Sequence, residues 1–193
     1  MKAIFSEIKD MFNKKLFFNS FIYILGDLIN KAVPFILLPI LTRYLSPEDY
    51  GIVAIFTVLV SIFSVFAGVN IHGAINVNFF NMHKDRLKIF IGNCIIILNI
   101  STLILFLIIW WFYPYIVSRV LLELEWVLLA VILAFSQFLT TVNLILWVAE
   151  EKPRQYSIYQ ISQTLLITIL SIIFIVGFGM NWKGQVIAKA IGI

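Results

Sequence analysis

Two ionisable residues lie inside a long apolar stretch near the start of the chain, where lipid is the expected solvent. Asp27 and Lys31 are four residues apart, which places them one turn apart on a helix and lets their charges pair. An unpaired charge at the middle of a bilayer costs on the order of 3 kcal/mol, so such residues usually pair or line a pathway. Asp27 and Lys31 are therefore candidates for a substrate or ion pathway, with a purely structural buried ion pair as the alternative.

A lone histidine and a patch of uncharged polar side chains are further pathway candidates. His72 could titrate near neutral pH or contact a phosphate, whereas a histidine near a helix end also serves as an interfacial hydrogen-bonding group. Gln137 lies in a later apolar run among other hydroxyl and amide side chains, namely Ser136, Thr140, Thr141 and Asn143. Such side chains either join helices by hydrogen bonds or bind sugar hydroxyls, and the sequence leaves both interpretations open.

The composition requires lipid around most of the elements that carry these residues. Of the 193 residues, 62% are hydrophobic, only 12% are charged and 18 are phenylalanine. A soluble core of this size cannot hide that much apolar surface, so we expect an all-α, polytopic integral membrane helical bundle. Crossing a bilayer takes about 20 apolar residues. The apolar runs predict five complete spans and a truncated sixth, over residues 18–41, 50–80, 89–113, 126–149, 156–179 and 185–193.

The first predicted span has one polar face, which a helix surrounded by lipid would not carry. Its members recur every three or four residues, with Asn30 and Lys31 together at one position of the series: Asn19, Tyr23, Asp27, Asn30 with Lys31, and Pro34. Pro34 and Pro39 each remove a backbone hydrogen-bond donor, which is tolerated where neighbours or cavity water satisfy the freed carbonyls. Both observations predict that this face lines a cavity inside the bundle.

The turn between the first two spans has the residues of a helix start. Ser46 is a candidate N-cap, Pro47 follows at the first helical position, and the first turn is acidic. We expect the second span to run unbroken over residues 50–80. At 1.5 Å per residue it would be about 46 Å long, so its far end would project beyond the hydrocarbon core.

The N-terminal segment and the basic residues predict the orientation. Residues 1–17 alternate apolar and charged positions at helical spacing, which is typical of an amphipathic helix in the cytoplasmic membrane interface. This segment and the loops after the second and fourth spans hold nine Lys and Arg residues, against three on the opposite side. The positive-inside rule therefore predicts a multi-pass protein of the cytoplasmic (inner) membrane with a cytoplasmic N-terminus.

Several classes of function are disfavoured. The single cysteine, Cys94, lies within an apolar run, so we expect no disulfide framework, no metal site and no cofactor. The formal charge of +4 arises from basic residues scattered at the ends of apolar runs, so nucleic acid is not an expected partner. The sequence has no catalytic dyad, nucleotide motif or large loop, which argues against a membrane enzyme such as a polysaccharide polymerase or ligase.

Two stretches resemble a known family. Residues 34–56, PFILLPILTRYLSPEDYGIVAIF, resemble the signature that joins the first two helices of Wzx-type polysaccharide flippases. These are the O-antigen and capsule translocases of the multidrug/oligosaccharidyl-lipid/polysaccharide exporter superfamily. Residues 148–188, VAEEKPRQYSIYQISQTLLITILSIIFIVGFGMNWKGQVIA, are similar to the fourth-to-sixth helix region of the same family.

The resemblance implies a transporter of about a dozen or more helices in two similar bundles, of which residues 18–193 would supply most of the first. It also implies that the substrate is an undecaprenyl-pyrophosphate-linked oligosaccharide, moved across the membrane by alternating access for lipopolysaccharide or capsule biosynthesis. Membrane lipids and the polysaccharide polymerase and ligase machinery would be the other partners. Lys31 would hold the pyrophosphate, and Asp27 would neutralise Lys31 in the empty cavity or take up a coupling proton.

Two alternatives stay open at this point. An exporter of drugs or small cations from the same superfamily would also use an acid such as Asp27 for coupling, although it would gain little from Lys31. An inactive fragment is the other alternative, because the sixth apolar run is only nine residues long and half a transporter has no partner bundle to move against.

Overall fold

Seven α-helices and one π-helical turn make up the part of the chain that the computed structural model describes, which is residues 2–69, 71–116 and 122–193. In chain order they are α1 (Lys2–Tyr44), α2 (Pro47–Gly68), α3 (Ile71–Asn81), α4 (Lys84–Ile116), α5 (Leu124–Ala149), α6 (Pro153–Ile172), η1 (Ile173–Gly177) and α7 (Asn181–Gly192). The all-α prediction is confirmed.

Five segments are long and apolar enough to cross a membrane, as predicted: Phe17–Tyr44, Pro47–Gly68, Lys84–Tyr115, Leu124–Ala149 and Pro153–Gly177. The protein is therefore a multi-pass membrane protein. The truncated sixth span is not confirmed, because α7 is a helix of 12 residues that packs on α6 and α2 and is not among these five segments.

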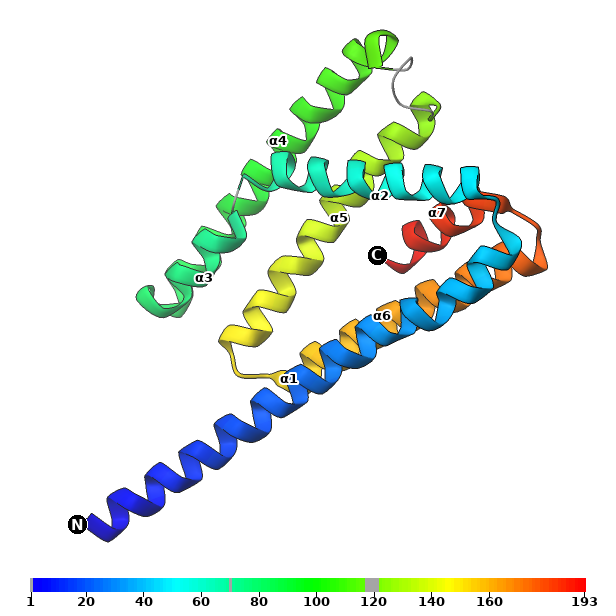
Figure 1. The fold of residues 1–193 in the computed structure, drawn as a ribbon. Coiled ribbons are helices and arrows are strands. Elements are labelled where there is room, and N and C mark those ends of the chain that lie inside the picture. The colour runs from blue at the N-terminus through cyan, green and yellow to red at the C-terminus, as the bar shows by residue number, and fades with distance from the viewer. Residues whose placement is uncertain (1, 70, 117–121) are drawn as a thin grey trace.

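Helix α7 lies between α2 and the pair formed by α1 and α6 (Figure 1). The blue α1 and the orange α6 run side by side in the same direction and form the most extensive helix pair. Helix α2 packs on α5 and α4, α3 packs on α5 and α4, and the red α7 lies against both α6 and α2. The helices from the two ends of the chain, α1 and α7, therefore both pack on α6.

The contact between α1 and α6 is close and polar. The backbone of α1 comes so near to α6 at Gly26 that an added Cβ would lie 2.5 Å from the Ser157 hydroxyl oxygen. That hydroxyl donates a 3.2 Å hydrogen bond to the carbonyl of Ile22, and the Thr164 hydroxyl donates to the Asn30 side-chain oxygen. The prediction that the polar face of the first span points inward is therefore confirmed at Asn30, one turn beyond Gly26.

The predicted helix start at Ser46 is confirmed in atomic detail. The Ser46 hydroxyl accepts a 3.1 Å hydrogen bond from the Asp49 backbone N–H, and the Ser46 backbone N–H donates a 3.2 Å bond to the Asp49 carboxylate. Pro47 occupies the first turn, where its missing N–H costs nothing. This reciprocal capping satisfies donors that the helix cannot satisfy itself and fixes the turn between α1 and α2.

The prediction of one unbroken helix over residues 50–80 is wrong. Helix α2 ends at Gly68, and Val69 adopts a left-handed conformation with φ 41° before α3 begins. A Cβ at Gly68 would collide with the ring of Phe138 on α5, and the Ser101 hydroxyl donates to the carbonyl of Ala67. The break thus depends on contacts with α4 and α5, so nothing in the local sequence reveals it.

The predicted boundary after residue 17 also does not appear in the backbone. Helix α1 is continuous over Lys2–Tyr44, with Pro34 and Pro39 inside it. The Thr42 hydroxyl donates a 3.1 Å hydrogen bond to the Pro39 carbonyl near the end of the helix. The interfacial position predicted for residues 1–17 stays a prediction.

Apolar side chains divide between a packed core and an outer surface. The largest buried cluster joins α2, α4, α5 and α7 around residues such as Phe56, Val131 and Val186, none of which exposes more than 1% of its surface. Many large apolar side chains of α1, α4 and α6 are exposed instead, for example Ile104 and Ile169. An outer apolar surface of this kind is what a bilayer-embedded bundle requires.

We predict that Gly26→Leu lowers the stability of the protein, because a side chain there must push α6 away and break the Ser157–Ile22 hydrogen bond. Overpacking of this kind costs about 1–3 kcal/mol. The measurement is the free energy of unfolding in detergent micelles, by SDS titration. Gly51→Leu is the matched control, since a Cβ at Gly51 meets nothing within 4 Å. Equal effects of the two substitutions would contradict the assigned contact.

Candidate functional site

A cavity of about 530 Å³ lies where α1, α2, α5, α6 and α7 meet, and we call it the polar cavity. This volume is within the range of small-molecule binding sites. Its lining residues come from all five helices: Asn30, Pro34, Leu37, Phe56, Thr57, Val60, Ser61, Leu133, Gln137, Thr140, Thr141, Leu144, Gln160, Gln163, Thr164, Ile167, Thr168, Ser171, Gln185, Lys189 and Ile193.

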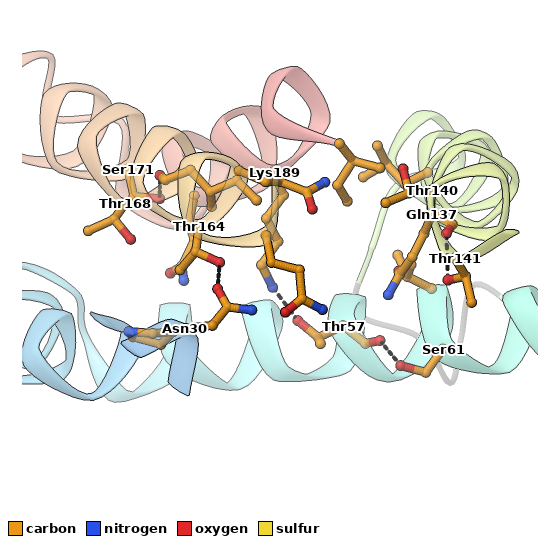
Figure 2. A pocket seen from close by; sticks show the side chains of 18 of the residues that line it. Asn30, Thr57, Ser61, Gln137, Thr140, Thr141, Thr164, Thr168, Ser171 and Lys189 are labelled. Carbon is orange, nitrogen blue, oxygen red and sulfur yellow. Dashed lines mark hydrogen bonds between the residues drawn. The ribbon is translucent and has the colours of Figure 1, made fainter. Parts of the chain in front are cut away.

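Hydroxyl and amide side chains dominate this lining. They account for twelve of the 21 lining residues. Figure 2 shows that those on α2, α5 and α6 face one another across the cavity. Pro34 adds a further polar atom, since its missing N–H leaves the backbone carbonyl of Asn30 without its usual helical partner.

Lys189 on α7 supplies the charge of the polar cavity. Within the described part of the chain, it is the one charged residue in the lining, and no carboxylate lines the cavity beside it. Its ammonium group donates a 2.7 Å hydrogen bond to the Thr57 hydroxyl on α2 (Figure 2). A cation held by one neutral hydroxyl keeps most of its attraction for an anion.

Several hydroxyls in the lining are already used by their own helices. Ser61, Thr141 and Ser171 donate to the backbone carbonyls of Thr57, Gln137 and Ile167, at 2.9, 2.9 and 2.7 Å. Their oxygen lone pairs remain available to accept from a ligand.

Two amide oxygens in the lining have no partner at all. The side-chain oxygens of Gln160 and Gln185 are buried and accept no hydrogen bond. An unsatisfied buried acceptor costs free energy, so both oxygens favour a ligand that brings hydroxyl or N–H donors.

The four residues predicted as pathway residues lie in different places. Gln137 lines the polar cavity, as a pathway residue must. Asp27 lies beside the Tyr156 hydroxyl at the α1–α6 contact, and this hydroxyl accepts a 3.0 Å hydrogen bond from the Gln160 side-chain nitrogen. Asp27 is therefore outside the cavity but linked to its wall by two side chains. The role of Asp27 and Gln137 in transport stays a prediction.

Lys31 and His72 do not line the polar cavity. Lys31 is exposed and outside the cavity lining. Within the described part of the chain no ion pair joins Asp27 to Lys31, so their predicted pairing does not form. His72 is exposed on α3, and its ring centroid lies 6.0 Å from that of Phe138. The predicted roles of both residues in transport are untested.

Sequence reasoning missed Lys189 and Thr57 as site residues. Lys189 carries the same signal that singled out Lys31, a lysine inside an apolar run, and that signal could have found it. Thr57 has no such signal, because a single threonine in an apolar helix is commonplace. The pairing of these two residues follows from the packing of α7 on α2, which joins segments 132 positions apart.

The comparison with protein families covers almost the whole chain. A family model described as polysaccharide biosynthesis protein matches residues 16–192. The chain belongs to this polysaccharide biosynthesis family. The match confirms the family resemblance predicted from residues 34–56 and 148–188.

Two curated proteins of Haemophilus influenzae are similar to parts of this family member. A protein of the Lsg locus is 36% identical over 78 residues, which are 40% of this chain and 20% of the relative. An uncharacterized membrane protein is 35% identical over 71 residues, which are 37% of this chain and 18% of the relative. The chain thus matches about a fifth of the length of each relative. No solved structure matches it.

We predict that Lys189→Met stabilises the ligand-free protein. Methionine keeps a similar side-chain volume while removing a charge that has no carboxylate partner, and such replacements gain about 1 kcal/mol or more. The measurement is the free energy of unfolding in micelles, with Lys84→Met on an exposed helix end as the matched control. A loss of stability in Lys189→Met alone would show that the bond to Thr57 is structural and would contradict a binding role for this charge.

Proposed function

We propose that this protein translocates lipid-linked oligosaccharide across the cytoplasmic membrane for surface polysaccharide biosynthesis. The observation that carries the proposal is the polar cavity, with twelve hydroxyl and amide side chains and one lysine inside a bundle whose outer surface is apolar. The proposed substrate is an undecaprenyl-pyrophosphate-linked oligosaccharide, whose sugars would enter the cavity while the polyprenyl chain stays in lipid. Membership of the polysaccharide biosynthesis family supports this role.

The chemistry of the lining suits sugars. Oligosaccharides carry many hydroxyl groups, each a donor and an acceptor, and the cavity offers hydroxyls, amides and two unpartnered amide oxygens. Hydrogen bonds made there gain strength because the surrounding bundle is apolar. Neutral side chains also let the substrate leave again, since no strong ion pair fixes each sugar. The lining therefore favours passage of a sugar over permanent binding.

The positive charge of Lys189 favours an anionic substrate over a cationic one. Lys189 would attract the pyrophosphate, for which a compact ammonium group acts as a point charge. A drug or small-cation exporter needs a carboxylate in its cavity, and none of the described lining residues is acidic. Asp27 would instead serve in coupling, because Tyr156 and Gln160 connect it to the cavity wall.

The proposed role is transport in a two-bundle protein and not catalysis. We propose that the N-terminus of α1 lies on the cytoplasmic side, as the distribution of Lys and Arg indicates. Because the chain matches about a fifth of each curated relative, alternating access, O-antigen or capsule as the product, and partnership with polymerase and ligase all belong to this proposal. The two-bundle arrangement would place the polar cavity against the second bundle.

The experiment that tests the proposal is complementation of a bacterial strain that lacks the flippase of its surface polysaccharide. We expect the protein to restore surface polysaccharide and to prevent accumulation of the lipid-linked precursor. Lys189→Gln and Gln163→Leu should lower export about tenfold or more, which is the size expected for losing a charge-assisted or buried hydrogen bond. Asp27→Asn should lower export without lowering the amount of protein in the membrane.

The matched controls are Lys84→Gln and Gln155→Leu, which change the same residue types at exposed positions outside the cavity. They should export normally. Equal export by the cavity variants and the controls, at equal protein levels, would refute a role of the polar cavity. If the unchanged protein restores nothing, it does not transport by itself.

A further inference from the structure

A second cavity lies at the start of α7, separate from the polar cavity. Its volume is about 380 Å³, and its lining is Trp126, Gly179, Met180, Asn181, Trp182, Lys183 and Ile187. None of these residues lines the polar cavity. We call it the tryptophan cavity, because Trp126 from the first turn of α5 and Trp182 from the first turn of α7 form two of its sides.

The backbone turn before α7 shapes the tryptophan cavity. Gly179 has φ +65°, a conformation that glycine adopts without strain, and the Met180 N–H donates a 2.9 Å hydrogen bond back to the Phe174 carbonyl. This turn reverses the chain between η1 and α7 and brings residues 179–183 to the side of α5. Trp182 consequently meets Trp126 edge to face, with ring centroids 4.9 Å apart.

Lys183 places a positive charge over both rings. Its ammonium nitrogen lies 5.7 Å from the ring centroids of Trp126 and of Trp182. Glu123 and Glu125 lie at the start of α5, yet neither of these described residues forms an ion pair with Lys183. The side chain is exposed, so its charge is accessible to a ligand.

Two indole rings and an ammonium group together recognise a particular ligand chemistry. The C–H groups on one face of a pyranose carry partial positive charge and pack on the electron-rich face of an indole, for the same reason that a cation does. An ammonium group adds attraction for a phosphate or carboxylate attached to that sugar. A pair of tryptophans that only anchored the protein at the membrane interface would not need a cavity beside them.

We propose that the tryptophan cavity is a second binding site, which takes a sugar bearing an anionic group, such as a sugar phosphate. The choice of this ligand rests on the proposed function, whereas the existence of the site rests on the cavity and its three side chains. Trp182 contacts the sugar ring, Trp126 holds Trp182 in place, and Lys183 binds the anionic group. A substrate leaving or entering the polar cavity at this end of α7 would meet this site.

The test is ligand-observed NMR of the full chain in phosphatidylcholine nanodiscs, with glucose 1-phosphate as the probe. Saturation transfer from the protein to the sugar ring protons reports contact with the indole rings, and titration gives the dissociation constant. We expect saturable binding that weakens about tenfold or more in Trp182→Ala and in Lys183→Ala. Trp182→Phe retains a ring and should retain part of the affinity, which separates loss of stacking from loss of folding.

Matched controls distinguish this site from the polar cavity and from the surrounding interface. Trp111→Ala removes a tryptophan that is 71% exposed and lies outside the tryptophan cavity, and Lys84→Gln removes an exposed lysine outside both cavities. Both should bind the probe normally. Binding lost in Lys189→Gln but kept in Trp182→Ala would overturn the proposal, because the ligand would then occupy the polar cavity.

Two further outcomes would also overturn it. Equal affinity for inorganic phosphate and glucose 1-phosphate would reveal a site for anions alone, and displacement by phosphatidylglycerol added to the nanodiscs would identify a lipid headgroup as the occupant. Binding and export are measured in separate assays. A failure of complementation therefore leaves the binding result standing, and a failure of binding leaves the proposed function standing.

Discussion

Hydrocarbon offers no hydrogen-bond partner, and this constraint accounts for the direction in which the polar side chains of the bundle point. The α1–α6 contact shows the effect most clearly. Ser157 bonds to the backbone of α1 and Thr164 bonds to Asn30, so each hydroxyl finds a partner on a neighbouring helix. The close approach at Gly26 makes these bonds possible, since any side chain there would separate the two helices.

More polar side chains face the interior than the contacts between helices can pair, and the polar cavity lies among the remaining ones. Helices α5 and α6 contribute eight amide and hydroxyl side chains to the lining, and α7 closes the space with Lys189 bonded to Thr57. This hydrogen bond adds a polar link to the apolar packing of α7 on α2. An anion that draws Lys189 away from Thr57 would loosen that link, so ligand binding and the position of α7 are expected to be coupled.

Sequence reasoning predicted those features that depend on periodicity and local chemistry. The five spans, the Ser46 cap and the inward polar face of α1 follow from hydropathy, capping preference and spacing. Lys31 could not be placed by the same reasoning. It follows Asn30 by one residue, which is about 100° around the helix, and so it lies away from the cavity that Asn30 lines.

The break after Gly68 and the role of α7 needed the fold itself. Phe138, which packs on Gly68, is 70 positions further along the chain, and no local pattern indicates a left-handed valine at position 69. Lys189 and Lys31 look alike in the sequence, since each is a lysine inside an apolar run. Only the packing of α7 on α2 and α6 distinguishes them, because it turns Lys189 into the cavity and leaves Lys31 outside.

The central claim is that a water-accessible, positively charged cavity exists in the membrane-embedded bundle, and thiol labelling tests it most directly. In a Cys94→Ser background, Thr168→Cys and Gln163→Cys should react with membrane-impermeant methanethiosulfonates, and faster with the anionic than with the cationic reagent. Lys189→Gln should abolish that preference, whereas lipid-facing Ile169→Cys should not react. Failure of both cavity cysteines to react, or a preference that survives Lys189→Gln, would contradict the claim.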